Sequence, residues 1–324
     1  MTEPLLVVED LVTRFYTELG VVKAVDGNSL QLAHGESLGV VGESGSGKTV
    51  TALSVMRLIE NPGRIESGRI MFRGEDLLAK SERQMRRIRG RDIAMVFQDS
   101  LSSLNPTLTI GEQITRVLRF HLGLSRQERW RRAVELLRQV GIPEPEQRVK
   151  HYPHQFSGGM RQRALIAMAI SCSPQLLILD EPTTALDVTI EAQIFELVQE
   201  LKQAFGMGTF LITHDLSVVA TFCDRVVIMY AGKIVEEAPV TGLYDRTLHP
   251  YTRGLLNSIP PLEGGVSRLD SIPGEVPDLI SLPPGCNFCP RCRLADERCW
   301  REEPPLVDFS PGRRVACWKA GEPR

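Results

Sequence analysis

The stretch Gly42-Glu43-Ser44-Gly45-Ser46-Gly47-Lys48-Thr49 decides the fold of this chain. An apolar run, Leu38–Val41, precedes it, and a helix-forming stretch from Lys48 to about Ile59 follows it. A strand, a glycine-rich loop and a helix in this order open a βαβ unit, and the spacing matches the phosphate-binding loop G-x-x-x-x-G-K-[ST] in full. The sequence therefore predicts an α/β fold that binds a nucleoside triphosphate.

Each residue type in this loop has a physical reason. Glycine lets the backbone fold around phosphates without a Cβ clash, and the loop N–H groups and the helix N-terminus then face the anion. Lys48 would reach the β- and γ-phosphates, and Thr49 would ligate Mg²⁺. The predicted ATP-binding residues of the loop are Gly42, Ser44, Gly45, Ser46, Gly47, Lys48 and Thr49. The alternative, a glycine-rich turn with a chance lysine, is disfavoured by the strand and helix on either side.

Two adjacent carboxylates end a second apolar run. Leu176–Leu179 reads as a buried strand, and Asp180 and Glu181 follow it directly. Asp180 would lie beside the metal and hold Mg²⁺, while Glu181, one residue further, would polarise the attacking water as a general base. A strand that merely reaches the surface in charged residues is the alternative, and the phosphate loop makes it less attractive.

The remaining pattern is that of a mostly parallel α/β core. Short apolar runs typical of strands buried on both faces are Leu176–Leu179, Ile93–Phe97, Thr209–Thr213 and Val226–Tyr230, and Leu5–Val12 reads as a first strand. From about residue 100 to residue 165 the pattern is helical, which predicts a helical insertion. After Leu243, proline and glycine become dense, which predicts a C-terminal appendage with little regular structure.

Composition and charge exclude several classes of protein. The 324 residues are 42% hydrophobic and 24% charged, as in ordinary globular proteins. The net charge of −2 argues against a mainly electrostatic nucleic-acid partner. No apolar run approaches the roughly 20 residues that span a bilayer, and the acidic start Met1–Pro4 is unlike a signal peptide. We therefore expect a cytosolic protein whose membrane role comes through a partner.

The stretch Phe156–Arg163 resembles the signature of the ABC ATPase family, whose common form is LSGGQ followed by a basic helix. Phe156 and Met160 replace the leucine and the glutamine of that form, but Ser157 and both glycines are present. The resemblance implies the ABC ATPase cassette, with a phosphate-loop parallel-sheet core, an antiparallel N-terminal β region and a helical insertion. It also implies a head-to-tail dimer in which Ser157 and Gly159 bind the ATP held by the partner's loop.

The resemblance implies further site residues in the order that the family shows. Gln98 looks like the Q-loop glutamine, which contacts Mg²⁺, ATP and the attacking water. Ala185-Leu186-Asp187 resembles the D-loop, so that Asp187 belongs to the ATP site, and His214 looks like the switch histidine at the γ-phosphate. We also expect an aromatic residue near the N-terminus to stack on adenine, Phe15 first and Tyr16 second, with plain core packing as the alternative.

The resemblance narrows in the C-terminal part. Leu243-Tyr244 and the run His249–Leu256 are similar to the extension on ATPases of dipeptide and oligopeptide importers. This resemblance implies that the chain hydrolyses ATP to energise the uptake of di- or oligopeptides. ATPases of the related nickel and glutathione importers are the alternatives. The implied partners are a second ABC ATPase subunit that is a different chain, two membrane permease subunits and an extracytoplasmic peptide-binding protein, without nucleic acid. The chain would be peripheral, at the cytoplasmic face of the inner membrane.

Five of the seven cysteines fall between Cys286 and Cys317. Clustered thiols in a cytosolic protein suit an iron–sulfur cluster or structural zinc before they suit disulfides. The family resemblance implies a [4Fe–4S] cluster held by Cys286, Cys292, Cys299 and Cys317. Cys289 departs from the family pattern and is either a spare thiol or a replacement for one ligand. A cysteine-rich tail without metal is the remaining alternative.

We expect three parts in this chain. Residues 1-99 and 166-242 would form a RecA-like α/β ATP-binding core, residues 100-165 a helical signature subdomain, and residues 243-324 a peptide-importer-type extension with the cysteine cluster. Competing hypotheses are a soluble ABC protein of DNA repair or translation, an iron–sulfur assembly factor and an export ATPase. Repair members carry a long coiled coil or a zinc hook, translation members usually two cassettes, and exporters often a fused membrane domain. One cassette with an importer-like tail favours uptake.

Overall fold

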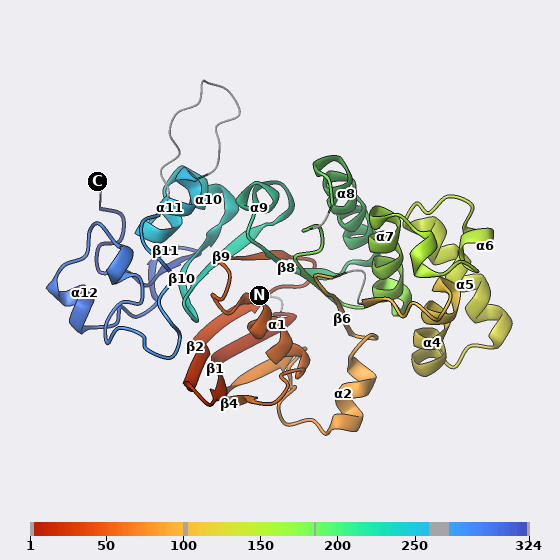
Figure 1. Ribbon diagram of the computed structural model, residues 1–324, viewed down its shortest axis with the longest axis horizontal. Coiled ribbons are helices and arrows are strands. Elements are labelled where there is room, and N and C mark those ends of the chain that lie inside the picture. The colour runs from red at the N-terminus through yellow and green to blue at the C-terminus, as the bar shows by residue number, and fades with distance from the viewer. Residues whose placement is uncertain (1–2, 100–102, 185, 259–271, 323–324) are drawn as a thin grey trace. The chain divides into compact units, whose positions relative to one another are not determined.

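The computed structural model describes residues 3–99, 103–184, 186–258 and 272–322. The chain forms two compact units, each assembled from separate stretches of sequence (Figure 1). The first unit comprises Met1–Leu5, Leu32–Ser37 and Phe72–Ile212, and the second comprises Leu6–Gln31, Leu38–Met71 and Thr213–Arg324. The chain thus passes repeatedly from one unit to the other.

A parallel sheet organises the first unit. In it, β7 (Leu176–Asp180) pairs in parallel with β6 (Ile93–Val96) and with β8 (Gly208–Thr213). Every residue of β7 and β8 is buried, as expected of strands that are covered on both faces. Val96 is the register partner of Leu179, so the segments that follow β6 and β7 leave the same edge of the sheet. These strands confirm the apolar runs identified in the sequence.

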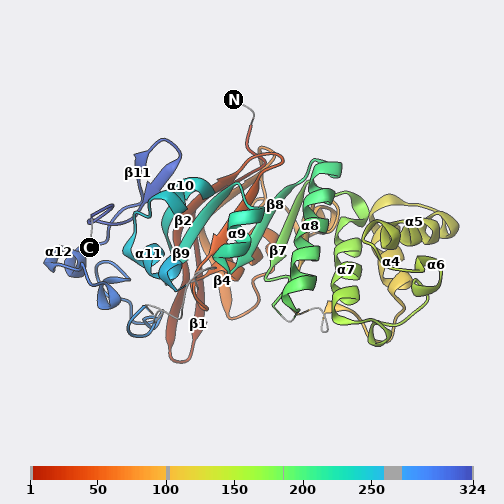
Figure 2. The same ribbon diagram turned by 90° about the horizontal axis from the view of Figure 1, so that it is seen from above.

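Helices make up most of the rest of the first unit (Figure 2). Capping boxes begin three of the α-helices described in this unit, because Ser81 pairs with Gln84, Thr109 with Glu112 and Ser125 with Glu128. Among the described residues, no helix combines the length and the apolar character that crossing a membrane requires. The remaining elements of this unit are β5 (Glu75–Asp76), α2 (Glu82–Ile88), α4 (Ile110–Leu122), α5 (Arg126–Gln139), α6 (Pro145–Arg148), η1 (Pro153–Gln155), α7 (Gly158–Ala169), η2 (Ile170–Cys172) and α8 (Val188–Phe205).

Two groups of strands build the second unit. In one group β1 (Leu6–Thr17) lies between β2 (Gly20–Leu32) and β4 (Gly63–Phe72). Only two residues connect β1 to β2, which makes these strands an antiparallel hairpin and confirms the expected N-terminal β region. In the other group β3 (Ser37–Val41) pairs in parallel with β9 (Arg225–Tyr230).

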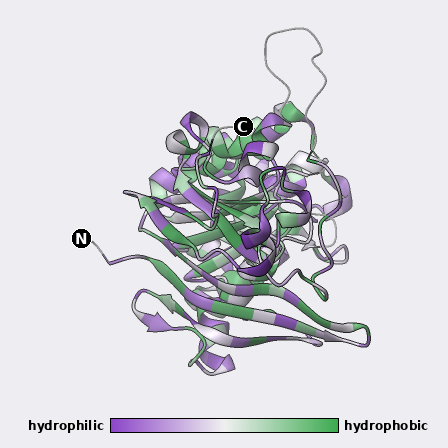
Figure 3. Cartoon of the chain, turned by 90° about the vertical axis from the view of Figure 1, so that its left-hand side faces the viewer, coloured by the Kyte–Doolittle hydropathy of each residue, from purple (hydrophilic) through white to green (hydrophobic). Residues whose placement is uncertain are grey.

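Helices and C-terminal strands complete the second unit. β9 pairs antiparallel with β10 (Lys233–Pro239), and β10 pairs antiparallel with a strand from the C-terminal end of the chain. Figure 3 shows hydrophobic residues concentrated along the strands. The remaining elements are α1 (Lys48–Met56), α9 (Leu216–Phe222), α10 (Val240–Asp245), α11 (Pro250–Asn257), η3 (Cys289–Arg291), α12 (Glu297–Arg301), β11 (Val307–Ser310) and β12 (Arg313–Val315).

The C-terminal region is part of the second unit, which corrects the prediction of a separate cysteine-rich appendage. Its Phe288 packs edge-on against Tyr230 of β9, with ring centroids 5.1 Å apart, and lies 5.4 Å from the ring of Tyr251. Tyr230 and Tyr251 are themselves 4.6 Å apart, and all three rings are buried. Aromatic burial of this kind stabilises by area and by ring geometry. The region therefore shares its core with the sheet, despite its many prolines and glycines.

Charge pairing ties the same region to β10. Glu236 and Glu237 are buried on that strand, at 0% and 4% exposure. Arg313 of β12 lies 3.3 Å from Glu236, and Arg314 forms an ion pair with Glu237. A buried carboxylate is costly without a partner, so removal of β12 would leave Glu236 without its arginine, whereas Glu237 would keep its ion pair with Arg225 of β9.

His249 is a fully buried imidazole at the start of α11. Its Nδ1 accepts a hydrogen bond of 3.0 Å from the backbone N–H of Tyr251, and the backbone N–H of His249 donates to the buried Glu236 carboxylate at 2.9 Å. Its Nε2 has no partner among the described residues. Burial lowers the pKa of His249 to about 3, because the charged imidazolium would lose its hydration. The folded protein therefore keeps His249 neutral where an unfolded chain would protonate it.

Acidification is expected to destabilise the second unit through His249. Below the ordinary pKa of about 6.5 the unfolded state binds a proton that the folded state does not, so stability falls as the pH drops. Between pH 7 and pH 5 this loss is about 2 kcal/mol. Urea unfolding at the two pH values measures it. In His249→Asn the side-chain oxygen can still cap α11, and the loss of unfolding free energy between pH 7 and pH 5 should be about 2 kcal/mol smaller than in the parent. The control His34→Asn, at an exposed histidine, should lose as much as the parent. Equal losses for His249→Asn and the parent would contradict this assignment.

Candidate functional site

The predicted phosphate loop joins β3 to α1 in the second unit, and close packing requires two of its glycines. A Cβ at Gly42 would lie 2.2 Å from the carbonyl oxygen of Met229, and one at Gly47 would lie 2.2 Å from that of Ala24. Gly47 also has a φ of 100°, which side-chain-bearing residues rarely adopt. Glycine at these two positions is therefore needed by the neighbouring backbone as well as by any bound phosphate.

Two polar groups in the loop fit a phosphate. Lys48 is buried, and its Nζ donates to the carbonyl oxygens of Gly42 at 2.7 Å and Glu43 at 3.0 Å. The hydroxyl of Ser46 is buried and has no hydrogen-bond partner among the described residues. A buried ammonium and a buried unpaired hydroxyl are donors that an anion accepts from. The residues present thus fit the triphosphate of ATP.

Gln98 and Glu181 meet in the first unit, at the carboxyl edge of β6 and β7. The Glu181 carboxylate accepts hydrogen bonds of 3.1 Å from Gln98 Nε2 and from the hydroxyl of Thr184. Its backbone has a φ of 44°, and its N–H donates to the Ile212 carbonyl at 2.9 Å. Left-handed backbone at a non-glycine residue is costly and concentrates at functional sites. The structure therefore brings these two predicted catalytic residues together and adds Thr184, which no sequence motif singled out.

The other predicted metal and phosphate contacts lie at the ends of strands and helices. Asp180 is the last residue of β7 and is 3% exposed, while Thr49 is in the first turn of α1, in the second unit. His214 follows β8 and is exposed. Asp187 begins α8, where its carboxylate accepts from the Ile190 N–H at 3.0 Å. Ala185, named above as part of the D-loop, lies outside the described residues.

The signature stretch begins α7. Ser157 is exposed at the N-cap position, where its hydroxyl accepts from the Met160 N–H at 3.3 Å. A Cβ at Gly159 would lie 2.9 Å from Ile190 of α8, and one at Gly158 would lie 3.3 Å from Leu186. These glycines therefore let α7 approach α8 closely. A helix N-terminus capped by an exposed serine also suits an anion, because its N–H groups carry partial positive charge.

The two aromatic candidates for adenine stacking occupy opposite faces of β1. Phe15 is partly buried and lies so close to Gly63 that a Cβ there would be 2.6 Å from its ring. Tyr16 is 45% exposed, its hydroxyl donates to Glu66, and Arg64 lies over its ring at 5.6 Å. Successive strand residues point to opposite faces, so one of the two at most can face a nucleotide.

The C-terminal cysteines do not form the predicted metal site. Among the described residues, which include all five of these cysteines, no group of three or more His, Cys, Asp or Glu side chains is placed to hold a metal ion. The cysteines are free thiols, and burial raises the pKa of each, to about 12 for Cys286 and about 11 for Cys289 and Cys317. The placement of these thiols therefore supports neither a [4Fe–4S] cluster nor zinc.

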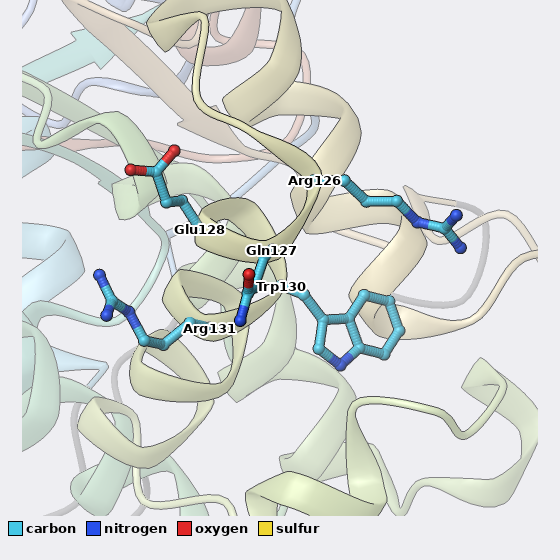
Figure 4. Close-up of a pocket in the computed structure, with 5 residues that line it drawn as sticks. All are labelled: Arg126, Gln127, Glu128, Trp130 and Arg131. Atoms are coloured by element: carbon cyan, nitrogen blue, oxygen red, sulfur yellow. The ribbon is translucent and has the colours of Figure 1, made fainter.

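A surface hollow beside α5 contains none of the predicted site residues. Its lining is Arg126, Gln127, Glu128, Trp130 and Arg131 (Figure 4). Arg126 and Trp130 extend to one side of the helix, and Glu128 and Arg131 to the other. Because these side chains do not converge on one point, they do not form a catalytic site.

Two family models match the chain. Residues 25–184 match the ABC transporter model, and residues 235–299 match the model of the oligopeptide/dipeptide transporter C-terminal region. A probable peptide ABC transporter ATP-binding protein of Sinorhizobium fredii is 52% identical over 98% of this chain and 96% of its own length. The oligopeptide transport ATP-binding protein AppD of Bacillus subtilis is 50% identical over 97% of this chain and 96% of its own length.

Solved structures agree with this assignment. A dimeric ATP-binding cassette, MJ0796, in a post-hydrolysis state with ADP and phosphate, superposes with a TM-score of 0.66 and 26% identity. The match covers 72% of this chain and 98% of that cassette. The fold is thus the ABC ATPase cassette, and the chain belongs to the ABC transporter family as an ATP-hydrolysing subunit of the peptide-transporter type.

Proposed function

We propose that this chain hydrolyses ATP to energise the uptake of di- or oligopeptides through a membrane permease. The observation that carries the hydrolytic part is Glu181, which is held by Gln98 and Thr184 at the end of a buried strand. The peptide part is supported by the match to the oligopeptide/dipeptide transporter C-terminal region and by the names of the relatives at about 50% identity.

In this mechanism the second unit binds the phosphates. Lys48 contacts the β- and γ-phosphates, Ser46 and the loop N–H groups complete the cradle, and His214 contacts the γ-phosphate. Thr49, Asp180 and Gln98 are the residues that would hold Mg²⁺, which would supply positive charge to offset the charge that develops on the phosphates. Among the aromatic candidates Phe15 or Tyr16 stacks on adenine.

The first unit supplies the groups that act on water. Glu181 accepts a proton from the attacking water as general base, and Gln98 orients that water. Turnover requires a dimer, in which Ser157 and Gly159 at the N-terminus of α7 bind the ATP held by the partner subunit, with Asp187 near by. The dimeric state of the MJ0796 cassette with ADP and phosphate supports this arrangement.

The domain organisation and the assembly follow from the same proposal. Residues 1-99 and 166-242 act as the ATP-binding core, residues 100-165 as the signature subdomain, and residues 243-324 as the importer-type extension. The partners are a second ABC ATPase, two permease subunits and an extracytoplasmic peptide-binding protein. The chain then works at the cytoplasmic face of the membrane as a peripheral subunit.

Substrate-stimulated ATP hydrolysis tests this function. The tagged chain is captured from native membranes, the complex is reconstituted, and its binding protein is added with di-, tri- and longer peptides, nickel chelates or glutathione. We expect stimulation by one length class of peptide, and none in a complex that carries Glu181→Gln. Stimulation by nickel or glutathione alone would keep the importer and reject the peptide. Failure to capture any membrane partner would reject the transport function.

A further inference from the structure

Two residues of the C-terminal region hold Glu43, the second residue of the phosphate loop. Arg291 binds its carboxylate with both terminal nitrogens, Nη1 to Oε2 at 2.6 Å and Nη2 to Oε1 at 3.1 Å. The buried hydroxyl of Tyr251 accepts a hydrogen bond of 2.9 Å from the Glu43 N–H. All three residues belong to the second unit. The loop is thus bound through both the side chain and the backbone of one residue.

The two anchoring side chains are themselves fixed. Arg291 is 7% exposed, its Nε donates to the Pro273 carbonyl at 2.9 Å, and its guanidinium lies 5.8 Å from the Tyr230 ring centroid. Tyr251 is completely buried against Tyr230 and Phe288. The Arg291 side chain is 4% exposed and that of Glu43 30%, and a bidentate Arg–carboxylate pair that is partly buried is stronger and more specific in geometry than a fully exposed ion pair. The packing of the fold therefore holds both side chains in place for their contacts with Glu43.

Glu43 also connects these anchors to the residue expected to bind ATP. Its carbonyl oxygen accepts from Lys48 Nζ at 3.0 Å and from the Ser46 N–H at 3.2 Å. A loop that is already ordered loses less conformational freedom when a ligand binds. In addition, the Glu43 carboxylate would repel the triphosphate bound by the loop, and the Arg291 guanidinium offsets the negative charge of Glu43.

We propose that the C-terminal region sets the affinity of the ATP site, with Arg291 and Tyr251 as positioning residues for the phosphate loop. This inference rests on the proposed ATP-binding function. It assigns to the region matched by the oligopeptide/dipeptide transporter model a role at the nucleotide, through the Glu43–Arg291 pair.

The charge part of the inference is tested by loss and rescue. In the full-length chain Arg291→Ala is expected to raise the Kd for ATP about tenfold, since the Glu43 carboxylate is left without its partner. The KM for ATP should rise in parallel while kcat at saturating ATP stays within about twofold, as expected when binding alone is weakened. Adding Glu43→Gln should return the Kd to within about threefold of the parent, because the uncompensated charge is gone.

The matched control is Arg301→Ala in the same region. Arg301 also pairs with a carboxylate, that of Glu297 at 3.5 Å, but both side chains are largely exposed and neither touches the loop. Its Kd should equal that of the parent. A merely structural role for Arg291 predicts no rescue by Glu43→Gln, so an unrescued double variant would overturn the charge argument.

Tyr251→Phe tests the backbone contact without disturbing the ring packing. Loss of one hydrogen bond to the Glu43 N–H should raise the Kd for ATP about threefold to tenfold. Thermal unfolding shows whether each variant is folded. If Arg291→Ala does not fold, the Kd of Tyr251→Phe for ATP decides whether the inference holds. An unchanged Kd in folded Tyr251→Phe and folded Arg291→Ala would overturn the inference. If the parent chain itself fails to bind ATP, the proposed function fails instead.

Discussion

Glu181→Gln is expected to lower ATP turnover by about 100- to 10,000-fold, the range that a positioned general base contributes, while ATP still binds. The amide is the same size as the carboxylate, and its oxygen can still accept from Gln98 and Thr184, so the left-handed turn after β7 should persist. What is lost is the basicity that takes a proton from water. Phosphate release gives the turnover, and titration with ATP gives the Kd.

The same variant should accumulate an ATP-bound dimer, because the nucleotide that closes the dimer is no longer hydrolysed. Size-exclusion chromatography with and without Mg-ATP detects it. Glu196→Gln is the matched control, since Glu196 is an exposed carboxylate on α8 of the same unit. Its turnover should equal that of the parent. Normal turnover by Glu181→Gln would show that another group activates the water.

Lys48→Ala is expected to weaken ATP binding by about 100-fold or more, which corresponds to the loss of charge-assisted hydrogen bonds to phosphate. The ammonium is already buried in the loop and directed by the Gly42 and Glu43 carbonyls, so no other cation of the loop can replace it. Hydrolysis should fall below detection for the same reason. Isothermal titration with ATP measures the change.

The control for this variant removes a lysine that lies outside the phosphate loop. Lys150→Ala removes an exposed lysine of the first unit and should leave the affinity unchanged. Thermal unfolding of Lys48→Ala shows whether the loop carbonyls tolerate the loss of their donor. A folded Lys48→Ala variant that binds ATP as tightly as the parent would show that the phosphate loop is not part of the ATP site.

The parts of the fold that the sequence predicts well are those with strong local patterns. The runs at β6, β7 and β8 are mostly apolar because the strands are buried, and the observed bounds agree within one residue with the predicted ones. In contrast β4 was missed, because its burial alternates too irregularly to produce a period-two pattern. Burial on one face, set by distant neighbours, leaves little trace in a local window.

The candidate site divides in the same way. Short sequence motifs predict Asp180, Glu181 and the phosphate loop, because the residues of each motif are neighbours in the sequence. Arg291 lies 248 positions from Glu43, and no local pattern announces that contact. The cysteine spacing suggested a metal site, but spacing along the chain does not determine where the thiols lie, and among the described residues no three of them are placed to hold one metal ion.

The shared aromatic core of Tyr230, Tyr251 and Phe288 has a consequence for chimaeric proteins made from relatives. A C-terminal region transplanted from another ATPase brings its own ring and its own cation to β9 and to the phosphate loop. Core substitutions that change volume by even one methylene are felt. We therefore expect a chimaera to bind ATP more weakly than its parents when the residues at positions 43, 230, 251, 288 and 291 come from different lineages.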